Sequence, residues 1–167
     1  TSSQMRSGTI TIASTTFTVN QAGATCSYVL TSGGTSAPIH SGGGSGSIGV
    51  DAAAIDCAWT AASQADWITL TGATSLTGDG AVPFSVAPNT SSLPRLGVIL
   101  VAGQSYTVTQ NGLSCGYALS PTTATVAAAG GSGSVALTAA VNDCTWSATP
   151  AAGGPPGAAP SPVFVSP

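Results

Sequence analysis

An internal repeat constrains the fold of this chain more than any other feature, because self-similar segments fold as copies of one structural unit. The segment TSSQMRSGTITIASTTFTVNQAGATC at residues 1–26 aligns without a gap with TSSLPRLGVILVAGQSYTVTQNGLSC at residues 90–115, and roughly half of the positions are identical. The similarity continues in CSYVL and CGYAL, in GGSGSIGV and GGSGSVAL, and in DCAWTA and DCTWSA. The chain therefore holds nearly two copies of one module.

We expect the chain to begin partway through a module rather than at its first strand. The first copy continues through DWITL and a Gly-rich turn to FSVAP at residues 84–88, whereas the second has Pro- and Gly-rich sequence before VFVSP at residues 163–167. We align these last two segments with each other. We therefore expect residues 1–25 to be the last two strands of a module, residues 26–113 to be a complete module, and residues 114–167 to be a module without those two strands.

Alternation of polar and apolar residues predicts the strands. TITI at residues 9–12 and FTVN at residues 17–20 have the period of two that is typical of half-buried strands, with a short turn between them. The second copy repeats this hairpin, with YTVT at residues 106–109. No stretch has convincing helical periodicity, so we predict an all-β fold of tandem antiparallel β-sandwich modules. Further strands are expected near residues 27–31, 46–50, 58–62, 67–70, 82–87, 116–119, 133–138 and 145–148.

The composition excludes several classes of protein. Only two residues are Lys or Arg, too few to neutralise the phosphates of a nucleic acid. Hydrophobic residues make up 43% of the chain, which argues against disorder, yet no apolar run approaches the roughly 20 residues of a membrane helix. The richness in Ser, Thr, Gly and Ala and the lack of Lys favour a secreted surface protein over a cytosolic one.

Four cysteines occupy equivalent places in the two copies. Cys26 with Cys57, and Cys115 with Cys144, would each close a loop of about 30 residues, worth roughly 3–4 kcal/mol in the chain-entropy model. Pairing within each module is the simplest connectivity. A metal site is the alternative, but Cys-x-x-Cys spacing is absent and His40 is the only histidine, so we expect no metal and no cofactor.

The aromatic residues recur at equivalent strand positions, which favours core packing. Trp59 matches Trp146 just after a cysteine, and Tyr28 matches Tyr117. Trp67 has no counterpart but lies in an apolar alternation, and we expect it in the core as well. A sugar-binding face offers exposed aromatic rings beside polar groups, and the sequence shows no clear platform of this kind.

The charged residues suggest structural contacts. Arg6 and Arg95 are equivalent, and we expect each to make a hydrogen bond or ion pair at a strand entrance, with Asp56 and Asp143 as candidate partners. Anion binding is the alternative function of these arginines. His40 stands alone in a Ser- and Gly-rich loop, so we expect no catalytic residue and no enzyme activity.

Asn89 begins the glycosylation sequon Asn-Thr-Ser. The motif is short, so it marks only a candidate site.

The order of the motifs resembles the BACON family. Cys-x-Tyr-x-Leu is followed by a Gly-Gly-Ser-Gly-Ser stretch, Cys-x-Trp, a Trp-Ile strand, Arg-x-Gly and a hairpin that ends in Val-x-Gln. This resemblance implies an immunoglobulin-like β-sandwich of a bacterial extracellular protein, often in tandem arrays, with a suggested role in binding carbohydrate or mucin. The second copy departs from the pattern because it lacks the Trp-Ile strand. The residues that carry the resemblance are Cys26, Tyr28, Gly43, Cys57, Trp59, Trp67, Ile68, Arg95, Gly97, Val108 and Gln110.

The first hairpin and the last module are complementary. The hairpin carries one apolar face, and leaving its residues in water would forfeit about 1.5–3 kcal/mol each. The last module lacks the two strands that correspond to this hairpin, so it would expose a groove and unpaired strand edges. The apolar face consists of Ile10, Ile12, Phe17 and Val19, and the core of the acceptor module is expected to consist of Tyr117, Leu119, Val135, Leu137, Trp146, Val163 and Val165.

Three arrangements follow. The hairpin inserts into the open module of another copy and builds a head-to-tail filament by donor-strand complementation, or it folds back onto its own chain, or the chain is a segment of a longer tandem array. The leading hypothesis is an extracellular filament subunit whose partner is itself. The alternative is a carbohydrate- or mucin-binding module of a secreted or surface-anchored repeat protein.

Overall fold

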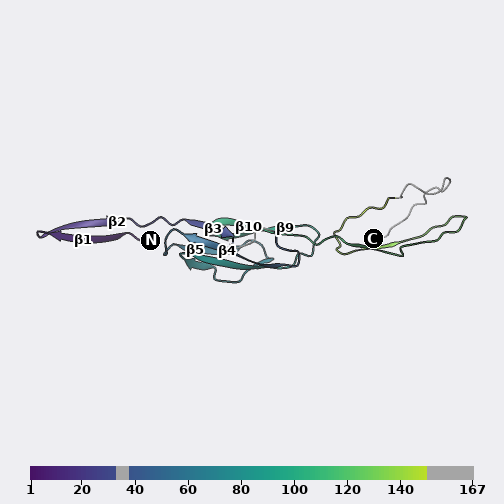
Figure 1. Ribbon diagram of the computed structural model, residues 1–167, viewed down its shortest axis with the longest axis horizontal. Helices are drawn as coiled ribbons and strands as arrows, with labels where there is room; N and C mark the ends of the chain where they lie inside the picture. The colour runs from purple at the N-terminus through teal and green to yellow at the C-terminus, as the bar shows by residue number, and fades with distance from the viewer. Residues whose placement is uncertain (33–37, 150–167) are drawn as a thin grey trace. The chain divides into compact units, whose positions relative to one another are not determined.

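The computed structural model describes residues 1–32 and 38–149, in which all regular secondary structure is β-strand (Figure 1). The prediction of an all-β fold is therefore confirmed. No helix capable of crossing a membrane is found among these residues. The strands are β1 (Arg6–Ile12), β2 (Thr15–Gln21), β3 (Tyr28–Ser32), β4 (Gly44–Ala52), β5 (Ala58–Ser63), β6 (Ile68–Leu70), β7 (Ser75–Thr77), β8 (Gly80–Val86), β9 (Arg95–Val101), β10 (Gln104–Gln110), β11 (Tyr117–Ser120) and β12 (Ala136–Ala139).

The chain divides into two compact units. Unit 1 contains Thr1–Asn89 and Pro94–Asn111, and unit 2 contains Thr90–Leu93 and Gly112–Pro167. The short segment between β8 and β9 therefore belongs to unit 2, although both of its neighbouring strands belong to unit 1.

Two antiparallel sheets make up the body of unit 1. One has the strand order β10-β9-β5-β7 and the other has the order β3-β4-β8-β6. Apolar residues alternate along the strands, as in β8, where Val82, Phe84 and Val86 are buried. Side chains from both sheets form one core, as in other β-sandwiches. The buried members of this core are Ile39, Ile48, Val50, Trp59, Ala61, Ile68, Val82, Phe84, Val86, Ile99, Val101 and Val108.

Two strand assignments differ from the sequence prediction. Ser75–Thr77 form β7, which pairs with β5 so that Leu76 lies opposite Trp59, whereas the sequence there, with one large apolar residue, suggested only a turn. The prediction of a strand near residues 145–148 is wrong, because the structure has no strand there. Its counterpart β5 pairs with β7 and β9, and the described part of unit 2 provides no equivalent partners.

The hairpin β1–β2 repeats the geometry of β9–β10. Each hairpin pairs seven positions, and the register is the same in both, from Arg6 opposite Gln21 and Arg95 opposite Gln110 up to the turn. Both turns have positive φ at their two central residues, Ala13 and Ser14 in the first and Ala102 and Gly103 in the second, as tight two-residue hairpin turns require. The two segments therefore share a structure as well as a sequence.

Unit 2 repeats the beginning of the module. Its strands β11 and β12 pair antiparallel, as β3 and β4 do in unit 1. The turn before β4 has Gly43 at φ 90°, with its N–H donating to the carbonyl oxygen of His40 at 3.0 Å, and Gly130 at φ 86° makes the same bond to Ala127 at 2.9 Å. The two copies therefore share this strand pair and the turn that precedes its second strand.

A glycine within β4, Gly46, tests this correspondence. A methyl group at Gly46 would overlap the buried ring of Phe84, while a methyl group at the equivalent Gly133 would meet no atom within 4 Å. We expect Gly46→Ala to lower the free energy of unfolding of unit 1 by about 1–3 kcal/mol, the usual effect of overpacking, and Gly133→Ala to be close to neutral. Urea denaturation of the full chain, followed by methyl NMR signals of each unit, measures both effects. Equal destabilisation by the two variants would contradict this prediction.

Candidate functional site

One face of the hairpin β1–β2 is a stripe of large apolar side chains in contact with solvent. Because the strands pair with Ile10 opposite Phe17, side chains two residues apart and opposite each other share one face. The members of this hairpin stripe are between 47 and 65% exposed. The hairpin stripe consists of Ile10, Ile12, Phe17 and Val19.

The equivalent side chains of β9–β10 are covered. Ile99 and Val101 are completely buried and Val108 is 4% exposed, all within the core of unit 1. Tyr106, which matches Phe17, packs against this core and lies 6.4 Å from the Phe84 ring, centroid to centroid. The same strand pair is therefore part of a sandwich in one copy and uncovered in the other.

An arginine and a glutamine join the base of each hairpin. The Nε of Arg6 donates to Oε1 of Gln21 at 2.7 Å, and the Nε of Arg95 donates to Oε1 of Gln110 at 2.8 Å. The arginines are thus paired with glutamines rather than with the aspartates that the sequence suggested. Arg95 also lies 4.3 Å from the centroid of the Trp67 ring, a cation–π contact.

The carboxamide of Gln110 occupies a buried nest of backbone carbonyl groups. Gln110 is completely buried, and its Nε2 donates to the carbonyl oxygens of His40 at 3.1 Å, Ser41 at 3.3 Å and Ala87 at 3.0 Å. Burial of such an amide is costly unless its hydrogen bonds are satisfied. The equivalent Gln21 is exposed in its hairpin.

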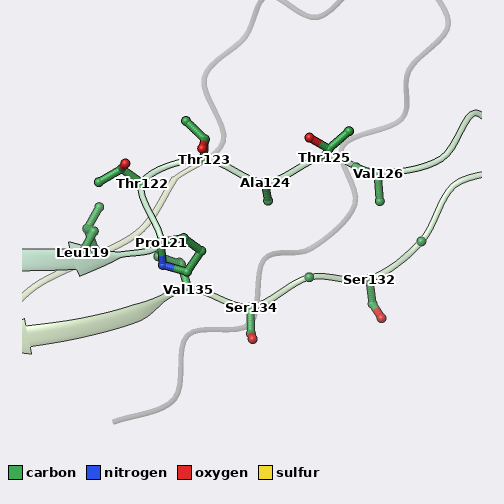
Figure 2. A pocket seen from close by; sticks show the side chains of 12 residues that line it. Leu119, Pro121, Thr122, Thr123, Ala124, Thr125, Val126, Ser132, Ser134 and Val135 are labelled. Atoms are coloured by element: carbon green, nitrogen blue, oxygen red, sulfur yellow. The ribbon is translucent and has the colours of Figure 1, made fainter.

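Unit 2 has an open groove of about 450 Å³. Figure 2 shows residues 121–126 along one side of the groove and residues 132–135 along the other, with Leu119 at one end and Val126 toward the opposite end. Both side chains are more than half exposed. The groove is lined by Leu119, Pro121, Thr122, Thr123, Ala124, Thr125, Val126, Gly131, Ser132, Gly133, Ser134 and Val135.

The expected core of the acceptor module is largely uncovered in the described residues. Tyr117, Leu119 and Trp146 are exposed, and Val135 and Leu137 are partly buried. Two further expected core residues, Val163 and Val165, lie outside the described residues.

The tryptophans of unit 1 pack in its core as expected. Trp59 is 3% exposed and its Nε1 donates to the carbonyl oxygen of Gly78 at 2.7 Å, and Trp67 packs against the core. The prediction that Trp146 is equally buried is not met, since this ring is 40% exposed. Trp59 is covered by Leu76 and by the backbone at Gly80, and the described part of unit 2 has no counterpart of these strands.

Each module contains the expected disulfide bond. Cys26 is bonded to Cys57 and Cys115 to Cys144, so pairing within each module is confirmed. The described residues contain no cluster of His, Cys, Asp and Glu that could hold a metal ion.

An aspartate beside each disulfide holds the segment that leads into the hairpin. Asp56 accepts hydrogen bonds from the hydroxyl of Ser2 and the backbone N–H of Ser3, both at 2.7 Å. In unit 2, Asp143 accepts from the hydroxyl of Ser91 and the backbone N–H of Ser92. We call these two arrangements the Ser–Asp clasps. These contacts were not predicted from the sequence, although both copies carry TSS and DC at equivalent positions.

Hydrogen bonding shifts the titration of both aspartates. The bond from the Ser3 backbone N–H, followed by that from the Ser2 hydroxyl, lowers the pKa of Asp56 from 3.8 to about 2. The Ser91 hydroxyl and the Ser92 N–H lower the pKa of Asp143 in the same direction. Each clasp therefore holds a carboxylate in its ionised form.

The sequon asparagine is buried. Asn89 is 4% exposed, and its Nδ2 donates to the carbonyl oxygen of Asn111 at 3.1 Å. A glycan on this nitrogen would require the contact to open.

The pKa of Asp56 predicts a loss of stability in acid. Because its folded-state pKa lies below the ordinary value of 3.8, the stabilising contribution is complete above about pH 4 and disappears as the pH falls toward about 2. We expect Asp56→Asn to weaken the pH dependence of the free energy of unfolding of unit 1. Urea denaturation of the full chain between pH 2 and 6 measures this dependence. The exposed Asp66, as Asp66→Asn, controls for loss of charge. An unchanged acid dependence in Asp56→Asn would contradict the assignment.

The comparisons with known proteins give one match. The family model BACON, described as "Putative binding domain, N-terminal", matches residues 58–111. No curated protein and no solved structure shows significant similarity to the chain. The matched segment runs from β5 through the hairpin β9–β10 and includes Trp59, Trp67, Arg95 and Gln110. Residues 58–111 of this chain therefore match the model of the BACON family, the family that the order of the motifs resembles.

Proposed function

We propose that the chain is a structural subunit of an extracellular bacterial assembly, in which the hairpin β1–β2 of one copy completes the sandwich of unit 2 in another. One observation carries the proposal: the hairpin stripe is the uncovered counterpart of the face that β9–β10 bury in unit 1. The partner of the chain is then a second copy of itself.

Energetics favour a partner for this hairpin. Isolated two-stranded hairpins are marginally stable in water, and burial of each large apolar side chain contributes about 1.5–3 kcal/mol as an upper estimate. Four such side chains together approach the free-energy cost of association, estimated at roughly 4–15 kcal/mol. Backbone hydrogen bonds at the strand edges add to the apolar contribution, as in other cases of strand addition.

The donor and the acceptor lie on different units of the chain, which determines the type of assembly. Contact between two different surfaces is heterologous, and it generates an open filament unless the rotation between subunits closes a ring. The two disulfides suit an oxidising extracellular environment.

The family description supports a second candidate function. A binding domain on the bacterial surface would present unit 1 or unit 2 to a ligand, and carbohydrate or mucin is the ligand class that the resemblance implies. A glycan array probed with the purified chain distinguishes the two functions, because a purely structural subunit gives no specific signal.

A paired substitution on the hairpin tests the assembly. Ile10→Thr with Phe17→Thr removes two opposed members of the hairpin stripe and keeps residues that favour strands. We expect the concentration needed for assembly to rise at least about 100-fold, since about 3 kcal/mol of burial is lost. Light scattering after size-exclusion chromatography, with electron microscopy, measures this change.

The control variant changes the opposite face of the hairpin. Thr9 lies opposite Thr18, and Thr9→Ser with Thr18→Ser should leave assembly unchanged. A wild-type chain that stays monomeric at all concentrations would overturn the proposal, as would assembly that both double variants affect equally.

A further inference from the structure

We infer that Gln21, held by Arg6, determines the register of hairpin insertion by seating its carboxamide on the carbonyl oxygens of Ala127 and Ala128 of another copy. This inference rests on the proposed function and specifies the contact through which it would operate.

Unit 1 contains the template for this contact. Ile39 forms a parallel bridge with Gln110 at the end of β10. The Ile39 N–H donates to the carbonyl oxygen of Thr109 at 2.8 Å, and the Asn111 N–H donates to the carbonyl oxygen of Ile39 at 2.9 Å. The next two carbonyl groups along this segment, those of His40 and Ser41, accept from the Gln110 carboxamide.

In the described part of unit 2, the same segment has no strand paired with it. The residues equivalent to Ile39, His40 and Ser41 are Val126, Ala127 and Ala128. In both copies, one small residue separates these three residues from the Gly-Gly-Ser-Gly-Ser stretch. Val126 is 58% exposed, whereas Ile39 is 8% exposed. Figure 2 shows Val126 in the lining of the groove.

One packing contact is also shared by the two segments. A side-chain methyl carbon of Ile39 lies 3.3 Å from the position of a Cβ on Gly44, and a side-chain methyl carbon of Val126 lies 3.0 Å from the equivalent position on Gly131. This shared contact supports the view that the segment in unit 2 can receive a strand end like that of β10.

The hairpin carries the matching strand end. Gln21 is held by Arg6 in the same way that Gln110 is held by Arg95, so its Nε2 is oriented before docking. In the template register, the Val126 N–H would donate to the carbonyl oxygen of Asn20, and the Ala22 N–H would donate to that of Val126. The donor and acceptor segments carry opposite charges. Arg6 is the one charged side chain of residues 1–22, and Asp143 is the one charged side chain of residues 113–167.

The apolar stripe alone leaves the register undetermined. A shift by one residue turns the stripe away from the groove, but a shift by two residues keeps it on the same face. Such a shift would move the Gln21 carboxamide away from its acceptors and leave a polar group unsatisfied, which costs free energy on burial. Gln21 therefore discriminates between registers that hydrophobic burial treats as similar.

The substitution Gln21→Glu tests this inference in the full chain. A glutamate still accepts the hydrogen bond from Arg6, but it has no N–H to donate and its charge faces carbonyl oxygens. We expect the hairpin to keep its backbone NMR signals in the unassembled chain, and the concentration needed for assembly to rise roughly 10- to 100-fold. The control is Gln4→Glu, which makes the same change of charge at an exposed residue near the base of the hairpin.

Hydrogen exchange gives an independent readout of the register. On assembly of the wild-type chain, the backbone amides of Val126 and Ala22 should become protected, since each gains an acceptor. The inference would be overturned, and the proposed function would stand, if assembly needs the hairpin stripe but tolerates Gln21→Glu as well as Gln4→Glu and leaves the Val126 amide unprotected. Absence of assembly in the wild-type chain would overturn both.

Discussion

Burial of the apolar face of a terminal hairpin is the interaction on which this structure depends. In unit 1, β9 and β10 supply Ile99, Val101 and Val108 to a core whose other members come from both sheets. Without that hairpin, one sheet would lose two of its four strands. The strand pair β1–β2 has the same register and turn, so it presents the same face without a core against it.

Polar groups make this packing specific. The Arg–Gln pair recurs at the base of both hairpins, and in unit 1 the buried glutamine donates to three backbone carbonyl groups. The Ser–Asp clasps recur as well, each beside a disulfide bond. In this chain, which has few charged residues, both arginines and both of these aspartates form hydrogen bonds with uncharged groups. Directional bonds of this kind distinguish one strand register from another, which apolar contacts do less well.

The sequence predicted local features well and partners poorly. The hairpins, the disulfide pairing and the core position of Trp59 follow from alternation and from the spacing of repeated residues. The strand β7 was missed because Leu76 is its only large apolar residue, and its identity as a strand comes from pairing with β5. The prediction of a strand near 145–148 was wrong because an apolar alternation forms no strand without neighbouring strands to pair with.

The sequence by itself determined that this chain is built from repeated β-modules. It also determined which cysteines form disulfide bonds with each other and which pair of strands carries an apolar face. These properties depend on neighbours in the chain and on its periodicity. Only the tertiary structure decided that Arg6 and Arg95 bind glutamines, that Asp56 and Asp143 hold serines, and that the same hairpin is buried in one copy and exposed in the other. These outcomes depend on which groups meet in space, and residues with similar local sequence meet different surroundings.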